Sequence, residues 1–423
     1  TGSQSSNQTK HTRSTRNPSL PPLIPFLPSR RRPPPAMATP APHFVDEILE
    51  EIFLRLPTPA ELARASTACP RFHRIITDRP FLRRFRKLHP PPLLGFVDGS
   101  RFLPVQAPHP SAPLARAFAD AADFTYSFVP GCSRWVPCDA RDGRVLLRGS
   151  ITYSSTKLAV CDPLSRRYVL LPLIPKEMTA QQHCLADFGH KLATIGKDED
   201  ETSFKVVWTV LCGSKLMVFV YNSVTTEWST SSSPFSVADP SWQNLGNLSR
   251  SSYLDGCFYW GSVWEDKLLV LDTRNMEFST IDTGHIMQLV DLPGKTWCFS
   301  SAVDGTKGAV EVFTLVSDQD HAEPSFHLCH TIQQNNGESS DEWKLKSIIS
   351  LPLGFGYCTV DEAEGFMFLL RNRELQPAGY VEDLIISVEV KTSELKNLCG
   401  ATRFHVDRGF HSYFGFPLSK PSL

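Results

Sequence analysis

The stretch LLVLDTRNMEFSTI, residues 268–281, contains two apolar segments separated by a polar turn that begins at Asp272. β-Branched, leucine and aromatic residues on both sides of such a turn are typical of two antiparallel strands joined in a hairpin. The preceding segment LDGCFYWGSV, residues 254–263, holds an Asp-Gly pair, which is a strong signal for a tight hairpin turn. We therefore expect residues 254–281 to form consecutive antiparallel strands.

Three other parts of the chain repeat this pattern: CDPLSRRYVLLP (161–172), LMVFVYNSVTTEWS (216–229) and LIISVEVKTSELKNL (384–398). The four polar turns begin at Asp162, Asn222, Asp272 and Lys391, at spacings of 60, 50 and 119 residues. A period near about 50 residues in an all-β stretch is typical of a propeller, and residues 131–423 would then hold about six blades. A β-sandwich with long loops would explain the strands but not the recurring period.

The repeats also share aromatic residues, at Tyr168, Trp228, Trp260 and Phe278. Because they recur at similar positions, we expect them to pack between blades rather than to stack on a ligand. The Asp and Asn residues of the turns are expected to hold those turns through side-chain hydrogen bonds.

Residues 44–57, FVDEILEEIFLRLP, have a different pattern, with apolar residues at helical spacing. Four acidic residues crowd the first part of this segment, where the helix dipole favours negative charge. Pro57 and Pro59 end the helix. A second short helix is expected over residues 60–66, a third after Pro70, and a last amphipathic turn or two over residues 81–88.

This arrangement resembles an F-box. The residues that match its signature are Ile48, Leu49, Ile52, Arg55, Leu56, Pro57, Leu62, Cys69, Phe72, Pro80, Phe81 and His89. Phe44-Val45 stands where the signature has Leu-Pro, and Phe72 stands where it has Trp. Because Val45 replaces a helix-starting proline, we expect a reduced affinity for the usual partner of an F-box. The segment LHPPPLLGF that follows is similar to the extension of grass-type plant F-box proteins, and the β repeats resemble their F-box-associated, kelch-like propeller.

The resemblance implies an α+β multidomain chain, with a small three-helix F-box followed by an all-β propeller of about six blades. It also implies that the F-box binds the Skp-type adaptor of a cullin ubiquitin ligase. The residues expected to make this contact are Ile48, Leu49, Ile52, Leu56, Pro57 and Leu62. A module of roughly 50 residues cannot bury all its apolar surface alone, which agrees with a protein partner.

Two other interpretations of this module stay open. The helices could pack only on the rest of their own chain. The basic cluster Arg79, Arg83, Arg84, Arg86 and Lys87 could bind nucleic acid, although such a cluster more often forms a solvated helix face.

The expected domain boundaries place a disordered Pro/Arg-rich segment at residues 1–42, the F-box at 43–89, a Pro/Ala-rich linker at 90–130 and the propeller at 131–423. Residues 1–36 hold six basic residues, no acidic ones and eight prolines. Such a composition cannot form a core. The segment resembles an organelle transit peptide, but we favour translated leader sequence before a true start at Met37, because Met37 lies just before the first well-patterned helix.

Composition argues against several functional classes. With 43 basic and 44 acidic residues the net charge is −1, so the overall charge does not indicate nucleic-acid or membrane-surface binding. The eleven Cys include no Cys-x-x-Cys pair, which favours a reduced intracellular setting over a disulfide framework. His327, Cys329 and His330 could offer metal ligands, but adjacent residues of a strand point to opposite faces.

No nucleotide-binding or hydrolase motif occurs in the chain. We therefore expect no catalytic residues, no metal and no cofactor, and we expect a substrate-recognition adaptor of a Skp–cullin–F-box ubiquitin ligase. Its partners would be the Skp-type adaptor, a cullin held through it, and an unidentified target on the propeller. The alternative is a glycan- or protein-binding propeller scaffold that acts outside a ligase. The expected location is the cytoplasm, the nucleus or both.

Overall fold

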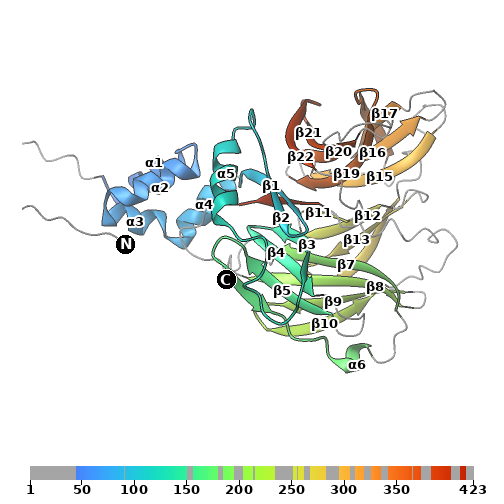
Figure 1. Ribbon diagram of the computed structural model, residues 1–423, viewed down its shortest axis with the longest axis horizontal. Coiled ribbons are helices and arrows are strands. Elements are labelled where there is room, and N and C mark those ends of the chain that lie inside the picture. The colour runs from blue at the N-terminus through green and yellow to red at the C-terminus, as the bar shows by residue number, and fades with distance from the viewer. Residues whose placement is uncertain are drawn as a thin grey trace, which may run out of the picture.

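The described part of the chain contains four helices followed by six antiparallel sheets, with two more helices, α5 (Ala112–Ala121) and α6 (Lys176–Thr179), between strands (Figure 1). The structure is a computed structural model, and it describes residues 44–89, 91–149, 156–179, 184–194, 203–212, 215–233, 251–254, 256–261, 267–282, 295–304, 310–318, 325–334, 342–363, 365–372, 383–401 and 410–415. The expected disordered segment 1–42, with Met37, lies outside these residues.

The helical module (residues 44–89) contains α1 (Asp46–Leu54), α2 (Pro59–Ala68), α3 (Pro70–Ile76) and α4 (Arg79–Leu88). The Thr58 hydroxyl caps α2 by accepting from the N–H of Glu61 at 3.3 Å, and the Cys69 thiol caps α3 by accepting from the N–H of Phe72 at 3.5 Å. α4 is a full ten-residue helix rather than a turn or two, because Pro80 occupies its first turn, where a missing N–H is harmless.

The propeller contains five sheets of four strands, each built from strands that are consecutive in the chain. Blade 2 contains β3 (Trp135–Arg141), β4 (Arg144–Gly149), β5 (Lys157–Asp162) and β6 (Arg167–Leu170), and blade 3 contains β7 (Cys184–Thr194), β8 (Phe204–Cys212), β9 (Lys215–Asn222) and β10 (Glu227–Ser232). Blade 4 contains β11 (Ser252–Leu254), β12 (Cys257–Gly261), β13 (Lys267–Asp272) and β14 (Glu277–Asp282). Blade 5 contains β15 (Lys295–Asp304), β16 (Val310–Asp318), β17 (Ser325–Gln334) and β18 (Glu342–Ser350), and blade 6 contains β19 (Gly356–Ala363), β20 (Phe366–Asn372), β21 (Asp383–Glu389) and β22 (Leu395–Ala401).

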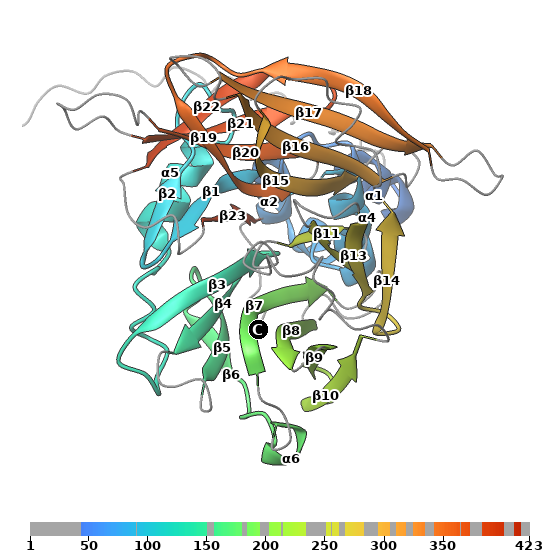
Figure 2. The same cartoon turned by 90° about the vertical axis from the view of Figure 1, so that its right-hand side faces the viewer.

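Blade 1 closes the ring with strands from distant parts of the chain. β1 (Leu93–Asp98) pairs with β2 (Arg101–Pro104) on one side and with β23 (His411–Phe414) on the other. β23 contacts β3 of blade 2 and β19 of blade 6, so it is the inner strand of its blade (Figure 2). The prediction of a propeller with about six blades is confirmed, but only five blades lie wholly within residues 131–423.

Residues 90–130 are not a simple linker, and the structure corrects that expectation. Besides β1 and β2 they contain α5 (Ala112–Ala121), which contacts both strands. All six residues of β1 are buried. Ala115 and Phe118 of α5 belong to the same apolar core as strands of blades 2 and 6. The prolines of this segment conceal the continuous apolar run at residues 93–97, which is typical of a buried strand.

The polar turns that predicted the propeller share one geometry. Oδ1 of Asp162, Asn222 and Asp272 accepts from the N–H two residues later, at 2.9, 2.9 and 2.8 Å. In blade 6 the same turn begins at Glu389, two residues before the predicted Lys391. A residue with left-handed φ follows four positions later in each case: Arg166 (56°), Thr226 (58°), Met276 (60°) and Ser393 (59°).

Apolar clusters fill the spaces between neighbouring blades, including those between blades 2 and 3, 3 and 4, and 5 and 6. Two tryptophans on outer strands tie one blade to the preceding one. Nε1 of Trp228 donates to the carbonyl oxygen of Pro172, and Nε1 of Trp343 donates to that of Asp282, both at 2.8 Å. Each blade is therefore stabilised mainly by its neighbours.

The predicted packing role of the repeated aromatic residues is confirmed for three of the four. Trp228, Trp260 and Phe278 are buried in the clusters between blades. Tyr168, on β6, is 40% exposed. For Tyr168 the prediction is wrong.

Carboxylates link the inner strands near the propeller axis. Oδ2 of Asp139, on β3, accepts from the N–H of Leu192 on β7 at 2.8 Å, and Oδ2 of Asp361, on β19, accepts from the N–H of Ser412 on β23 at 2.7 Å. Beside Asp361, burial and, to a smaller extent, the charge of Asp361 together raise the pKa of Glu362 to about 7. Folding therefore favours the protonated form of Glu362.

We expect Glu362→Gln to stabilise the protein at pH 8 but to change little at pH 5. The folded-state pKa of about 7 lies above the usual value of 4.5, so the contribution of Glu362 is fully present below pH 4.5 and is lost as the pH rises through 7. Removing the charge should raise the free energy of unfolding at pH 8 by up to about 3 kcal/mol. Urea unfolding at the two pH values tests this, and an equal difference at both would contradict it.

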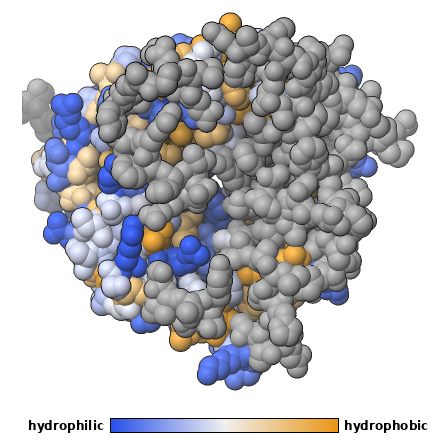
Figure 3. Space-filling model, turned by 45° about the vertical axis from the view of Figure 1, so that its right-hand side comes forward, coloured by the Kyte–Doolittle hydropathy of each residue, from blue (hydrophilic) through white to orange (hydrophobic). Residues whose placement is uncertain are grey.

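The described residues contain no helix that is both long enough and apolar enough to span a bilayer. On the face shown in Figure 3, the described residues mix hydrophilic and hydrophobic surface. In the helical module, exposed large apolar side chains follow one element.

Candidate functional site

One face of α1 exposes a row of large apolar side chains. Phe44, Ile48 and Ile52 are 46%, 47% and 44% exposed, and Val45 beside them is 54% exposed. A spacing of four residues places such side chains on one helix face, each above the next. We call Phe44, Val45, Ile48 and Ile52 the α1 stripe.

The opposite face of α1 builds the core of the helical module. Leu49, Phe53 and Leu54 are at most 6% exposed. They pack with residues of the other three helices, namely Leu62, Ile75, Ile76, Phe81 and Phe85. The helical module therefore has a core of its own, and the α1 stripe is not part of that core.

The six predicted contact residues divide between these two faces. Ile48, Ile52 and Pro57 are exposed, and Leu56 is half-buried against the core. Leu49 and Leu62 are only 6% and 5% exposed. The structure thus corrects the predicted face, because these two leucines hold the module together and do not reach its surface.

Phe44 and Val45 extend the exposed face, although the sequence argument did not include them among the contact residues. The spacing of four between Phe44, Ile48 and Ile52 was the available signal. This spacing alone could not show which residues are exposed, because Leu49 and Phe53 have the same spacing one position later.

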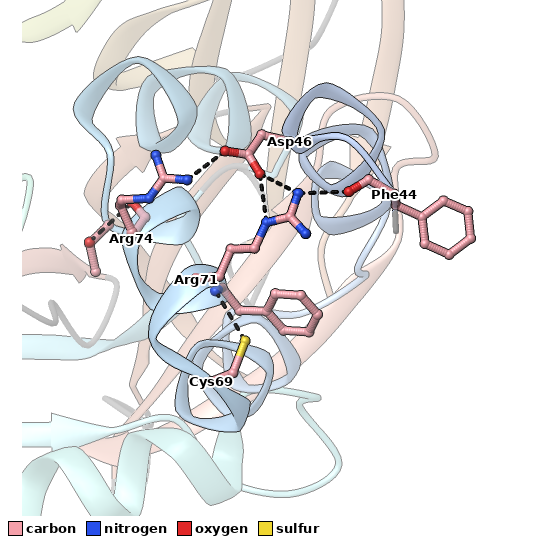
Figure 4. Close-up of polar contacts among 7 residues, drawn as sticks. Phe44, Asp46, Cys69, Arg71 and Arg74 are labelled. Carbon is pink, nitrogen blue, oxygen red and sulfur yellow. Dashed lines mark hydrogen bonds and ion pairs between the residues drawn. The ribbon is translucent and has the colours of Figure 1, made fainter. Parts of the chain in front are cut away.

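An ion-pair cluster joins the start of α1 to α3 (Figure 4). Asp46 lies between two guanidinium groups: Nε of Arg71 donates to its Oδ1 at 2.8 Å, and Nη2 of Arg74 donates to its Oδ2 at 2.5 Å. Nη2 of Arg71 also donates to the carbonyl oxygen of Phe44 at 2.6 Å. These hydrogen bonds, first from Arg71 and then from Arg74, hold the pKa of Asp46 below its usual value.

Two further contacts fix α4 against α1. Arg84 pairs with Glu50 at 2.9 Å and with Glu51 at 2.6 Å. Nε2 of His89 lies 2.7 Å from the carbonyl oxygen of Leu54, and the His89 ring packs on Phe85 with centroids 4.3 Å apart. Arg84, one member of the basic cluster that could have bound nucleic acid, is thus engaged by acidic residues of its own module.

The possible metal ligands on β17 are engaged separately. Cys329 is buried beside Val316, whereas Nε2 of His330 forms a buried contact with Oε2 of Glu311. Nδ1 of His327 lies 3.2 Å from the hydroxyl of Ser350. Across the part of the chain that the structure describes, no group of three or more His, Cys, Asp or Glu is placed to hold a metal ion.

The comparison with protein families agrees with this two-part architecture. A model described as F-box-like matches residues 46–87. A model described as "F-box protein AT5G49610-like, beta-propeller" matches residues 137–352, which is more than half of the chain. The chain is an F-box protein of the AT5G49610-like β-propeller family. The propeller match runs from blade 2 to the end of blade 5, so blades 1 and 6 of this F-box protein lie outside it.

An F-box combined with a β-propeller indicates, in general, a substrate-recognition adaptor of a Skp–cullin–F-box ubiquitin ligase, and such proteins are typically not enzymes. An F-box in general binds a Skp-type adaptor. In the helical module of this F-box protein, the α1 stripe is a row of exposed apolar side chains, and Leu88 of α4 is exposed as well.

No curated protein matches the chain. Among solved structures, it is similar to the β-propeller domain of Nup133 from Vanderwaltozyma polyspora, at 10% identity and a TM-score of 0.32 over 64% of this chain and 86% of that one. It is also similar to the β-propeller domain of the Trilobed protease from Pyrococcus furiosus, at 9% identity and a TM-score of 0.29 over 64% and 85%. These TM-scores are too low to transfer an activity.

Proposed function

We propose that this F-box protein is the substrate-recognition subunit of a Skp–cullin–F-box ubiquitin ligase. The α1 stripe binds the Skp-type adaptor, the adaptor connects the chain to a cullin, and the propeller binds a target protein. The chemistry belongs to other subunits. The F-box protein contributes by holding the target near the ubiquitin-charged enzyme, which raises the effective concentration of the reacting groups.

The observation that carries this proposal is the exposure of the α1 stripe on a module that already has a complete core. A helix usually turns its apolar face inward. α1 has two apolar faces, one inside the module and one in solvent, and burying a residue such as Ile48 against a partner stabilises a complex by about 1.5–3 kcal/mol. Burying such a stripe against a protein partner is energetically more favourable than leaving it exposed to water.

The subtype of the family, the cellular location and the kind of target also belong to this proposal. The kelch-like and grass-type plant character is proposed from the sequence resemblance. Location in the cytoplasm, the nucleus or both is supported by the nine cysteines whose side chains the structure describes, all of which are free thiols, as expected in a reducing compartment. The target is a protein that binds propeller loops, and its identity is set by those loops.

The test is reconstitution from purified components. The full chain is mixed with a Skp-type adaptor, with a cullin, or with both, and the complexes are separated by size-exclusion chromatography. We expect the chain to co-elute with the adaptor, and with the cullin only when the adaptor is present, because the chain reaches the cullin through the adaptor.

Three results would contradict the proposal. If the chain does not bind the adaptor, the α1 stripe has another role. If the chain binds the adaptor but the cullin never joins, the protein is a scaffold outside a ligase. Co-elution of cullin with the chain in the absence of the adaptor would also contradict the proposed order of assembly.

A further inference from the structure

Two arginines of α3 bind the start of α1, and one of them, Arg71, also reaches the residue before Val45. Val45, the residue before the helix, makes no side-chain capping hydrogen bond. Arg71 of α3 contacts both residues that flank it: Nη2 donates to the carbonyl oxygen of Phe44 at 2.6 Å, and Nε donates to Oδ1 of Asp46 at 2.8 Å. A planar guanidinium with several fixed donors is suited to such a double contact.

This contact restrains the part of the α1 stripe that lies outside the helix. Phe44 precedes α1, so no intrahelical hydrogen bond fixes its position. Figure 4 shows its carbonyl group turned toward Arg71 and its ring pointing away from the ion-pair cluster. The ring is 46% exposed, at the end of the row formed with Ile48 and Ile52.

We propose that Arg71 is a positioning residue for adaptor binding, because it pre-orders Phe44 and Val45 as part of the α1 stripe. The inference rests on the proposed function and adds a residue that touches no partner itself. A segment that is ordered before binding loses less conformational entropy when the complex forms. Ordering one residue corresponds to a factor of roughly ten in affinity, so loss of Arg71 should weaken binding by roughly tenfold.

Arg74 provides a matched control on the same helix. It binds the other oxygen of Asp46 at 2.5 Å, and its side chain is 68% exposed. Among the described residues it makes no hydrogen bond to Phe44, so it shares the ion-pair role of Arg71 without the positioning role. Arg74→Met should weaken adaptor binding by less than about threefold, since exposed ion pairs contribute little.

A second control tests whether Arg71 affects adaptor binding by holding Phe44 in place. If Arg71 acts by holding Phe44, then Arg71→Met should weaken binding in the original chain but hardly at all in a Phe44→Ala background. A double-mutant cycle measures this coupling. A purely structural role of Arg71 in joining α1 to α3 would weaken binding equally in both backgrounds.

A third variant offers rescue by a different route. Val45 has φ −70°, which is within the range that a proline ring imposes, and its N–H donates to no acceptor among the described residues. Val45→Pro would restrain the same segment without Arg71. We expect Arg71→Met/Val45→Pro to recover most of the affinity lost in Arg71→Met alone.

The experiment measures the Kd of the full chain and these variants for a purified Skp-type adaptor, with thermal unfolding as a check on folding. Roughly tenfold weakening by Arg71→Met, its absence in the Phe44→Ala background and its rescue by Val45→Pro are expected. If Arg71→Met binds like Arg74→Met, or weakens binding equally with and without Phe44, the positioning role is wrong while adaptor binding stands. If the unaltered chain does not bind the adaptor, the proposed function fails and the inference fails with it.

Discussion

Replacing Ile48 and Ile52 together by Lys is expected to abolish binding of the Skp-type adaptor. Both side chains are nearly half exposed, so each is available to a partner. The change removes about 1.5–3 kcal/mol of apolar burial per residue and places two charges in the interface, which costs several kcal/mol more. Adaptor affinity should fall by a factor of more than about 1,000.

Lys is the appropriate replacement because it leaves the helix intact. α1 already carries Asp46, Glu47, Glu50 and Glu51, so an added Asp would increase repulsion along the helix. Lys is a good helix former and can pair with these acids. The variant should therefore unfold like the original chain, and a loss of binding would report the interface.

Two further variants make the test specific. Val224→Lys changes a residue that is 61% exposed in the hairpin between β9 and β10, far along the chain from the F-box, and should leave adaptor affinity unchanged. Leu49→Lys should instead unfold the F-box, because Leu49 is 6% exposed in its core. Retained binding by Ile48→Lys/Ile52→Lys would show that the α1 stripe is not the docking surface.

Tyr413→Ala is expected to be the most destabilising single change in the propeller. Tyr413 lies on β23 and is 2% exposed. Its ring packs on those of Phe102, Phe118 and Phe124, with centroids 5.1–5.8 Å apart, and its hydroxyl donates to the carbonyl oxygen of Gly143 at 2.7 Å. Truncating a buried aromatic residue costs about 3–5 kcal/mol, a large part of the stability of a typical domain.

The matched control is Tyr413→Phe, which keeps the packing and removes only the hydroxyl. It should cost about 1–2 kcal/mol, the value of a hydrogen bond whose buried partner is left unsatisfied. Urea unfolding followed by tryptophan fluorescence gives both differences. If Tyr413→Ala were no less stable than Tyr413→Phe, β23 would not be the closing element that the strand pairing indicates.

The turns of the propeller could be predicted because they are local. An Asp or Asn that accepts from an N–H two residues later, as at Asp162 and Asn222, leaves a signal within six residues of sequence. Blade closure could not be predicted in this way. Residues 93–97 pair with residues 411–414, and nothing near Leu93 in the sequence indicates a partner so distant.

The helix α1 was predictable for a similar local reason, but its orientation was not. Ile48 and Leu49 are neighbours, and so are Ile52 and Phe53, so helical spacing gives one broad apolar surface. Which half of that surface faces inward depends on α3 and α4, whose Ile75, Phe81 and Phe85 close on Leu49 and Phe53. The candidate site is thus the half of α1 that tertiary packing leaves uncovered.

The pairing of β1 with β23 also orders events during synthesis. The F-box has its own core within residues 44–89, so it can fold as soon as it leaves the ribosome. β1 and β2 must wait until more than 300 further residues have been translated, because their inner partner is made near the end of the described chain. A nascent chain would therefore display its α1 stripe well before it has a finished propeller with which to select a target.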